Sequence, residues 1–368
     1  MNRISRIGVA VLLCALCLTV VVPAQGGPIG SQGGIVVANR ADGSISVIDV
    51  ATSGVTNFAL PAGTNTPEPM YVVYSLSNDL VFVGDRANDR VVAFDAQTFG
   101  VQATIPTGSG VFHMWGEPTL GQLWVNNDID KTVTAIDMNT FGVVSTFSTP
   151  ADLNAAGGKP HDVILDPSGP YGYVSMVGLS GPDDYVVKFS TDTYMELDRL
   201  AVGKDPHLSL SGFHDKLYVP SQNADEVAVL DRGTLDLITA LDVPTAHGAV
   251  TSPDGSFFYT TNIAGGGTDA VFVISTQFDT VVNSVDTPFG VPHNLALSPD
   301  AELLYVTHSG ATSDKVSIID VSDPNGPAYL TSVDVGLNPF GIGTVIPEPS
   351  TLLLGAVVLI GCTRRASR

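Results

Sequence analysis

A pair of strands recurs seven times along the chain, and this repeat limits the fold more than any other feature. Each copy is an alternating apolar segment ending in a short polar residue, followed by a turn and a second segment ending in Gly or Pro. The short polar residue is typical of a turn, because its side-chain oxygen accepts backbone N–H groups ahead of it. The copies are 44–63, 90–108, 132–150, 185–203, 226–244, 270–288 and 315–336.

A hairpin lies ahead of the strand pairs. In the clearest example, residues 292–308, a Ser-Pro-Asp turn at 298–300 separates two segments of alternating polarity. Each unit therefore holds about four short strands, and the units recur every 40 to 48 residues. Four strands at this period indicate one blade of a β-propeller. The sequence predicts an all-β, seven-bladed β-propeller of four-stranded blades over residues 34–346.

The two ends of this repeat region complement each other. The first copy starts at Gly34 without its leading strand, and a matching strand follows the last copy at 338–345. We therefore expect N- and C-terminal strands to share one blade, which closes the ring and removes exposed sheet edges.

Composition excludes some classes of function. The formal net charge is −21, so the chain cannot displace counterions from phosphates, and we expect no nucleic-acid partner. All three cysteines lie near the termini, at Cys14, Cys17 and Cys362. The repeat region therefore has neither a disulfide nor thiolate chemistry.

The N-terminus has the pattern of an export signal. Arg3 and Arg6 precede an apolar run over 7–22, and Val22-Pro23-Ala24 places small residues before a cleavage point. We predict a signal peptide over 1–24, cleaved after Ala24. The alternative is a retained anchor, but about 16 apolar residues are few for a membrane span.

The C-terminus, 347–368, combines Pro347-Glu348-Pro349, an apolar run over 352–361 and a basic end with Arg364, Arg365 and Arg368. It resembles the PEP-CTERM sorting tail. The resemblance implies an exosortase-type processing enzyme as partner, membrane attachment through this segment before processing, and release to the surface or extracellular matrix of a Gram-negative bacterium. An ordinary anchor facing the periplasm is the alternative, and both place the protein outside the cytoplasm.

Short motifs within the repeats point to a family. The segments YTTN at 259–262, YVTH at 305–308 and VVAN at 36–39, with VSIID at 316–320, resemble YVTN-repeat (YncE-like) seven-bladed propellers. The resemblance covers roughly 34–346, with departures such as Met176 in the Asn position. This family includes binding, scaffolding and metal-dependent members. Some related propellers hydrolyse lactones, but the sequence shows no base–nucleophile arrangement for that reaction.

Five of the seven histidines occupy one position of the repeat, on the leading strand. This strand is the innermost of a blade, so we expect a ring of imidazoles around one mouth of the central channel. His308 belongs to a second column, opposite His293 at the same rim. The first column is Met70, His113, His161, His207, His247, His293 and Phe340.

Two interpretations of these histidines remain open. Each imidazole could tie neighbouring blades together, as histidines do in other propellers. Alternatively, neutral imidazoles facing a channel could bind a transition metal, copper first, with Met70 as a thioether ligand. Nitrous-oxide reductase is similar in outline, although this chain has no separate cupredoxin-type domain. The candidate ligands are His113, His161, His207, His247, His293, His308 and Met70.

The sequence alone favours a non-enzymatic function. We expect an exported cell-surface or extracellular-matrix propeller that acts as a binding or scaffold protein, with a surface polysaccharide or protein as partner. The alternative is a copper-dependent periplasmic or surface redox enzyme that uses the histidine ring.

Overall fold

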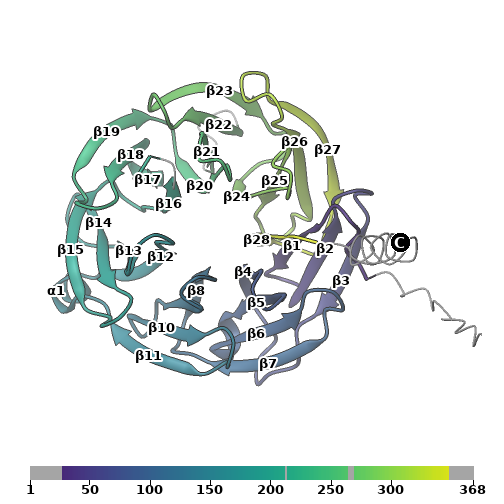
Figure 1. Ribbon diagram of the computed structural model, residues 1–368, viewed down its shortest axis with the longest axis horizontal. Helices are drawn as coiled ribbons and strands as arrows, with labels where there is room; N and C mark the ends of the chain where they lie inside the picture. The colour runs from purple at the N-terminus through teal and green to yellow at the C-terminus, as the bar shows by residue number, and fades with distance from the viewer. Residues whose placement is uncertain (1–26, 212–213, 264–268, 348–368) are drawn as a thin grey trace, which may run out of the picture.

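The computed structural model describes residues 27–211, 214–263 and 269–347. Seven four-stranded antiparallel sheets are arranged as blades around a central channel (Figure 1). The predicted seven-bladed propeller is therefore confirmed. The predicted signal peptide and the part of the predicted sorting segment from Glu348 onward lie outside the described residues. Within the described ranges, no helix is long and apolar enough to cross a membrane.

The innermost and second strands of each blade form the walls of the channel and the first layer behind them (Figure 1). The innermost strands are β4 (Pro69–Ser75), β8 (Val111–Glu117), β12 (Lys159–Leu165), β16 (Ser209–Ser211), β20 (Ala246–Thr251), β24 (Pro292–Leu297) and β28 (Pro339–Val345). The second strands are β1 (Gly34–Asn39), β5 (Leu80–Asp85), β9 (Gln122–Asn127), β13 (Tyr171–Val177), β17 (Lys216–Ser221), β21 (Phe257–Asn262) and β25 (Leu303–His308).

The third and outermost strands correspond to the seven sequence repeats. The third strands are β2 (Ser44–Asp49), β6 (Arg90–Asp95), β10 (Thr132–Asp137), β14 (Asp184–Ser190), β18 (Glu226–Asp231), β22 (Ala270–Ser275) and β26 (Lys315–Asp320). The outermost are β3 (Val55–Ala59), β7 (Val101–Pro106), β11 (Val143–Ser148), β15 (Glu196–Val202), β19 (Leu237–Asp242), β23 (Thr280–Asp286) and β27 (Ala328–Asp334). Three short helices complete the described chain: η1 (Arg86–Asn88), α1 (Ala151–Ala155) and η2 (Gln222–Ala224).

The ring closes as the sequence predicts. Strand β28 pairs antiparallel with β1, from Gly34 opposite Val345 to Asn39 opposite Pro339, so one blade has the order β28-β1-β2-β3. In Figure 1 the yellow C-terminal strand lies against the purple N-terminal one. Backbone groups that would form an open sheet edge are thereby paired.

The hydrophobic core lies between neighbouring blades. Trp124 on β9 is wholly buried and packs in one cluster with Val133 of its own blade and with Val163, Val174 and Val187 of the next. Strands near the axis, such as β1, β5 and β24, are buried along their whole length, whereas the outermost strands alternate between half-buried and exposed residues. This inter-blade packing fixes the backbone of the channel wall.

The turn after the third strand is closed by the terminal polar residue in six of the described blades, as the repeat predicts, at Asp49, Asp95, Asp137, Ser190, Asp231 and Asp320. Asp137 accepts the backbone N–H groups of Asn139 and Thr140 at 2.8 and 3.0 Å. Asp95 and Asp231 accept the N–H of the third residue ahead in the same way. These hydrogen bonds, led by the one from Thr140, hold the pKa of Asp137 below its usual value.

We expect Asp137→Ala to lower the free energy of unfolding by about 1 kcal/mol, because two N–H groups lose a charged acceptor but can turn to water. Urea denaturation monitored by circular dichroism measures the change. Asp236→Ala is the control, because no hydrogen bond of that carboxylate holds its turn. A loss equal to that of the control would contradict the capping role.

Candidate active site on the floor of the central channel

A β-bulge in the innermost strands shapes the site. On β12, Pro160 pairs with Met176 and Val163 with Val174, so His161 and Asp162 both lie opposite Ser175. The Asp162 N–H donates to the Ser175 hydroxyl at 2.8 Å instead of to a ladder carbonyl. The same irregularity occurs in β4, β8, β20 and β24. A bulge redirects side chains, so two consecutive residues of each strand reach the channel.

The first bulge residues form a closed circuit of rings. Phe112, His161, His207, His247, His293 and Phe340 follow one another with centroid separations from 3.8 to 5.0 Å, and Phe340 returns to Phe112 at 6.1 Å. This circuit, here called the aromatic ring, packs across one end of the channel.

Two placements made from the sequence need correction. Phe112, not His113, is equivalent to His161, because Val111 is the residue of β8 that pairs with the end of the second strand. Residue spacing alone does not reveal a bulge, so the repeat pattern placed His113 one residue away from its true equivalent position. Met70 does occupy the equivalent position, but its side chain is wholly buried in a hydrophobic cluster with Val111 and Met114, so we do not include it among ligands.

The second bulge residues form a buried hydrogen-bonded chain. The Asp162 carboxylate lies 2.7 Å from Nδ1 of His113, and Nε2 of His113 lies 2.6 Å from the Tyr71 hydroxyl. Because a carboxylate only accepts, Nδ1 carries the proton and Nε2 accepts from Tyr71. The Asn294 side-chain amide donates to the same hydroxyl at 3.2 Å. This chain joins strands β4, β8, β12 and β24.

Three imidazoles meet beside this chain. One ring nitrogen from each of His113, His161 and His207 lies within 4.8 Å of the other two. Nε2 of His161 and Nε2 of His207 are 3.3 Å apart. Two nitrogens bound to one tetrahedral zinc ion at 2.0–2.1 Å would be separated by about 3.4 Å. Within these three residues, here called the histidine trio, the His161–His207 pair is thus spaced for a shared ion, and the His113 nitrogen lies within 4.8 Å of both.

Asp162 serves two members of the histidine trio. Besides its bond to His113, its other oxygen lies 3.7 Å from Nδ1 of His207 and accepts the Leu208 N–H at 2.9 Å. A carboxylate behind a ligating imidazole fixes the tautomer and presents the opposite nitrogen to a metal. Asp162 has the position of such a residue. At His113 that nitrogen accepts from Tyr71 in this structure, so the tyrosine hydroxyl would have to release it for a metal to bind there.

Burial sets the protonation of these groups. It lowers the pKa of His113, against the attraction of Asp162, and lowers the pKa of His161 further with the help of neighbouring imidazoles. Burial alone would raise the pKa of Asp162, but His113 and His207 outweigh it and hold that pKa well below its usual range. At neutral pH the site therefore holds the Asp162 carboxylate beside neutral imidazoles of His113 and His161, the forms that bind metals.

The remaining predicted ligands lie outside the histidine trio. His308 is buried with Nδ1 against the Gly290 carbonyl at 3.1 Å and Nε2 against the Ser317 hydroxyl at 2.8 Å, so it ties strands together. His247 and His293 belong to the aromatic ring. Nδ1 of His247 lies 3.0 Å from the Gln222 side chain, and Nδ1 of His293 accepts from the Asn294 amide.

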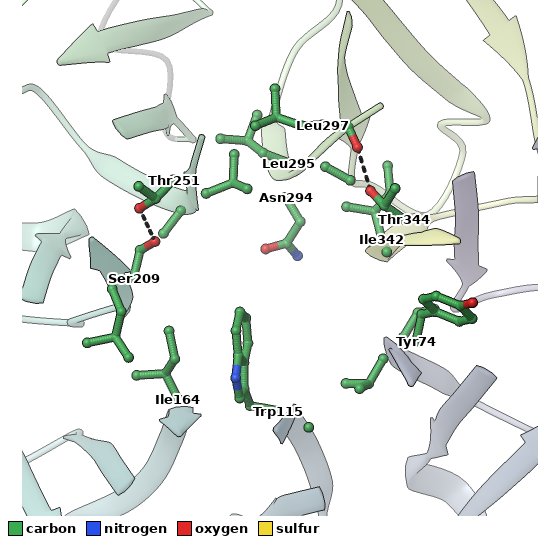
Figure 2. Close-up of a pocket in the computed structure, with 18 of the residues that line it drawn as sticks. Tyr74, Trp115, Ile164, Ser209, Thr251, Asn294, Leu295, Leu297, Ile342 and Thr344 are labelled. Atoms are coloured by element: carbon green, nitrogen blue, oxygen red, sulfur yellow. Dashed lines mark hydrogen bonds between the residues drawn. The ribbon is translucent and has the colours of Figure 1, made fainter. Parts of the chain in front are cut away.

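A cavity of about 750 Å³ fills the channel above this floor. Tyr71, His113, Asp162, His207 and Asn294 line its bottom, and the turns of the opposite face, including Pro167, Pro253 and Pro299, line its mouth. Of the aromatic ring, the lining includes only His207. Figure 2 shows Trp115 and Asn294 pointing into this space between aliphatic walls. A pocket of this size and character holds a small organic ligand.

Comparison with known proteins places the fold in a family. A family model described as lactonase, 7-bladed beta-propeller, matches residues 29–250, more than half of the chain. The chain belongs to this family. A search of curated protein sequences gives no match.

Solved structures of propellers resemble this lactonase-family chain at low identity. The periplasmic gluconolactonase of Pseudomonas aeruginosa is 18% identical, with a TM-score of 0.67 over 86% of this chain and 99% of the other. A functionally unknown protein from Desulfotomaculum acetoxidans is 15% identical, with a TM-score of 0.70 over 86% and 100%. A candidate 6-phosphogluconolactonase of Bacteroides uniformis is 18% identical, with a TM-score of 0.66 over 85% and 99%. These identities establish a common fold.

The buried imidazoles make this propeller sensitive to acid. Burial, with neighbouring imidazoles, holds the pKa of His247 and of His293 well below 6.5 in the folded protein. The unfolded chain takes up these protons below about pH 6.5 and the folded protein does not, so stability is complete above that pH and falls as the pH drops toward the folded-state values. Each histidine contributes up to about 1.4 kcal/mol per pH unit.

We therefore expect the melting temperature of the metal-free protein to fall steadily between about pH 7 and pH 5. Scanning calorimetry in matched ionic strength measures it. His247→Gln removes one titrating ring and is expected to flatten the dependence. A melting temperature that stays constant over this range would contradict buried neutral imidazoles.

Proposed function

We propose that the protein is a metal-dependent hydrolase of lactones, acting on the floor of the channel. The observation that carries the proposal is the histidine trio beside Asp162: His113, His207 and Asp162 line the bottom of a largely apolar cavity, and His161 lies against His207 outside the lining. Membership of the lactonase propeller family and the likeness to a gluconolactonase support an ester-opening reaction. Both favour an enzyme over the scaffold that the sequence suggested.

The donor set favours a borderline divalent ion such as Zn²⁺. Imidazole nitrogens suit zinc, copper, iron and nickel, and three of them leave a coordination position for water or substrate. The soft thioether that would favour copper is absent from the trio, since Met70 packs in the core. Such an ion polarises a carbonyl and lowers the pKa of bound water.

The chain's own residues supply proton transfer. Burial, the negative charge of Asp162 and that of Asp205 raise the pKa of Tyr71 well above 10, so its hydroxyl stays protonated and can donate. In lactone opening, a water oxygen bonds to the carbonyl carbon and the ring C–O bond breaks. Tyr71 gives its proton to the departing ring oxygen and regains one from the attacking water, which balances the hydrolysis to a hydroxy acid.

A direct test uses purified protein loaded with Zn²⁺ and a panel of γ- and δ-lactones in a pH-stat. We expect hydrolysis that is lost with a chelator and restored by the metal. Tyr71→Phe is expected to reduce kcat by about 100-fold while keeping the metal, because only the donor is removed. Absence of hydrolysis by the metal-loaded protein across the panel would overturn the proposal.

We also propose that this hydrolase works outside the cytoplasm. The basic and apolar segment ending at Ala24 and the tail that begins with Pro347-Glu348-Pro349 support export, sorting by an exosortase-type enzyme and a surface location. The YVTN-like motifs within the repeats are compatible with this placement. Mass spectrometry of protein from a Gram-negative host is expected to find Gln25 as the first residue. An intact Met1 terminus on folded protein would exclude the signal peptide.

A further inference from the structure

The walls of the cavity differ sharply from its floor. Above Tyr71 and His113 the inner strands present aliphatic side chains, among them Ile164, Leu295 and Leu297. The wall hydroxyls largely pair with one another or with backbone: Ser209 with Thr251 at 2.9 Å, and Thr344 with the Leu297 carbonyl (Figure 2). A ligand therefore finds its polar partners at the floor and apolar surface along the walls.

Charge restricts the ligand further. Among the described residues that line the cavity there is no Lys or Arg, whereas Glu117, Asp162 and Asp254 contribute carboxylates. The nearest cations at the floor, Arg40 and Arg86, lie over the rings of Phe340 and Phe112, outside the lining, and pair with Glu68 and Asp128. A phosphate or carboxylate on a substrate would meet uncompensated negative charge here.

An aromatic side chain gives the wall a contact surface. Trp115 lies on β8 two residues beyond His113, is 41% exposed and points into the cavity (Figure 2). An exposed indole in a pocket offers a large, rigid apolar face at small entropic cost. Trp115 lies two residues beyond His113 on the same strand, so its indole can contact the part of a ligand next to the ligand's reactive group.

We infer that the channel binds a neutral lactone with an apolar chain or ring substituent, its carbonyl at Tyr71 and the histidine trio and its substituent along Trp115 and the aliphatic wall. This inference rests on the proposed function, because the position of the lactone carbonyl follows from the proposed hydrolysis at the channel floor. It separates the protein from enzymes of phosphorylated sugar lactones, because the described residues that line the channel include no Lys or Arg to hold a phosphate. The cavity volume of about 750 Å³ accommodates a substituent of many carbon atoms.

The test compares γ-dodecanolactone, γ-butyrolactone and 6-phospho-δ-gluconolactone as substrates of the zinc-loaded protein. We expect kcat/KM for γ-dodecanolactone to exceed that for each of the other two by at least about 100-fold. Trp115→Ala is expected to reduce the preference for γ-dodecanolactone over γ-butyrolactone about tenfold, and Trp115→Phe less. Phe278→Ala is the matched control, since this 69% exposed aromatic residue lies outside the cavity lining. Preference for the phosphorylated substrate would overturn the inference and leave the hydrolase standing.

Binding without turnover separates the two proposals. γ-Dodecanolactone is titrated into chelator-treated protein while tryptophan fluorescence is followed; Trp124 is wholly buried, so Trp115 reports on the cavity. Saturable quenching that disappears in Trp115→Phe, without hydrolysis by the metal-loaded protein, would retain the binding site and reject the hydrolase. No saturable change with γ-dodecanolactone would overturn the binding site itself.

Discussion

Protein carrying His207→Ala is expected to lose its stoichiometric Zn²⁺ and to hydrolyse lactones more than about 100-fold more slowly than wild type, because removal of one of three ligands leaves too few to hold the ion. His207 contacts both another member of the histidine trio and the shared carboxylate. Its Nε2 lies 3.3 Å from Nε2 of His161, and its Nδ1 faces Asp162. Metal analysis after dialysis and initial rates measure the two losses.

The matched control for this variant is His247→Gln. His247 is also a buried ring histidine, 3.8 Å from His207 between centroids, but it lies outside the histidine trio. We expect it to retain metal and activity. Equal loss in both variants would show that the ring acts only in folding, as in the blade-tying interpretation. Wild-type protein that binds copper and performs electron transfer would instead support the redox alternative.

The propeller was predictable from sequence because the residues that form each blade recur seven times along the chain. Each turn aspartate, such as Asp137, and each alternating strand pair recurs at the same place, so seven weak local signals reinforce one another. Closure by β28 was predictable for the same reason, since the first repeat lacks a strand that the end of the last one supplies.

The buried hydrogen-bonded chain on the channel floor was not predictable in the same way. The second bulge residue is Tyr71, His113, Asp162 and Asn294 in four different blades, so this position shows no column of one residue type. In β4, β8, β12 and β24 a bulge directs the side chain at this position into the channel. A bulge does not alter the sequence periodicity, so it cannot be recognised from the repeat. Tyr71 and Asp162 were therefore missed as partners of His113, although each is a polar residue directly after a member of the predicted column, Met70 or His161, and that was a usable signal.

Asp162→Asn is expected to weaken metal binding by about 10- to 100-fold and to lower kcat/KM at least as much. An amide can donate a hydrogen bond to Nδ1 of His113, which favours the tautomer with its proton on Nε2, the nitrogen now facing Tyr71. That nitrogen could then neither bind a metal nor accept from the tyrosine. The backbone N–H of Leu208, which bonds to the other oxygen at 2.9 Å, can still bond to the remaining carbonyl oxygen, whereas the N–H of Val163 shares the His113-facing oxygen at 2.7 Å and loses its acceptor.

Asp205→Asn provides the comparison, because this carboxylate also approaches the histidine trio, 3.7 Å from Nε2 of His161. Unlike Asp162, it is partly exposed and does not stand behind an imidazole on the side away from the ion. We expect that substitution to change metal affinity by less than about threefold. Zinc titration against a competing chelator measures both variants, and calorimetry verifies that each is folded. If Asp162→Asn held zinc as tightly as Asp205→Asn does, the carboxylate would be a fold-stabilising acceptor for strands β12 and β16, and the metal centre would have to be sustained by the imidazoles alone.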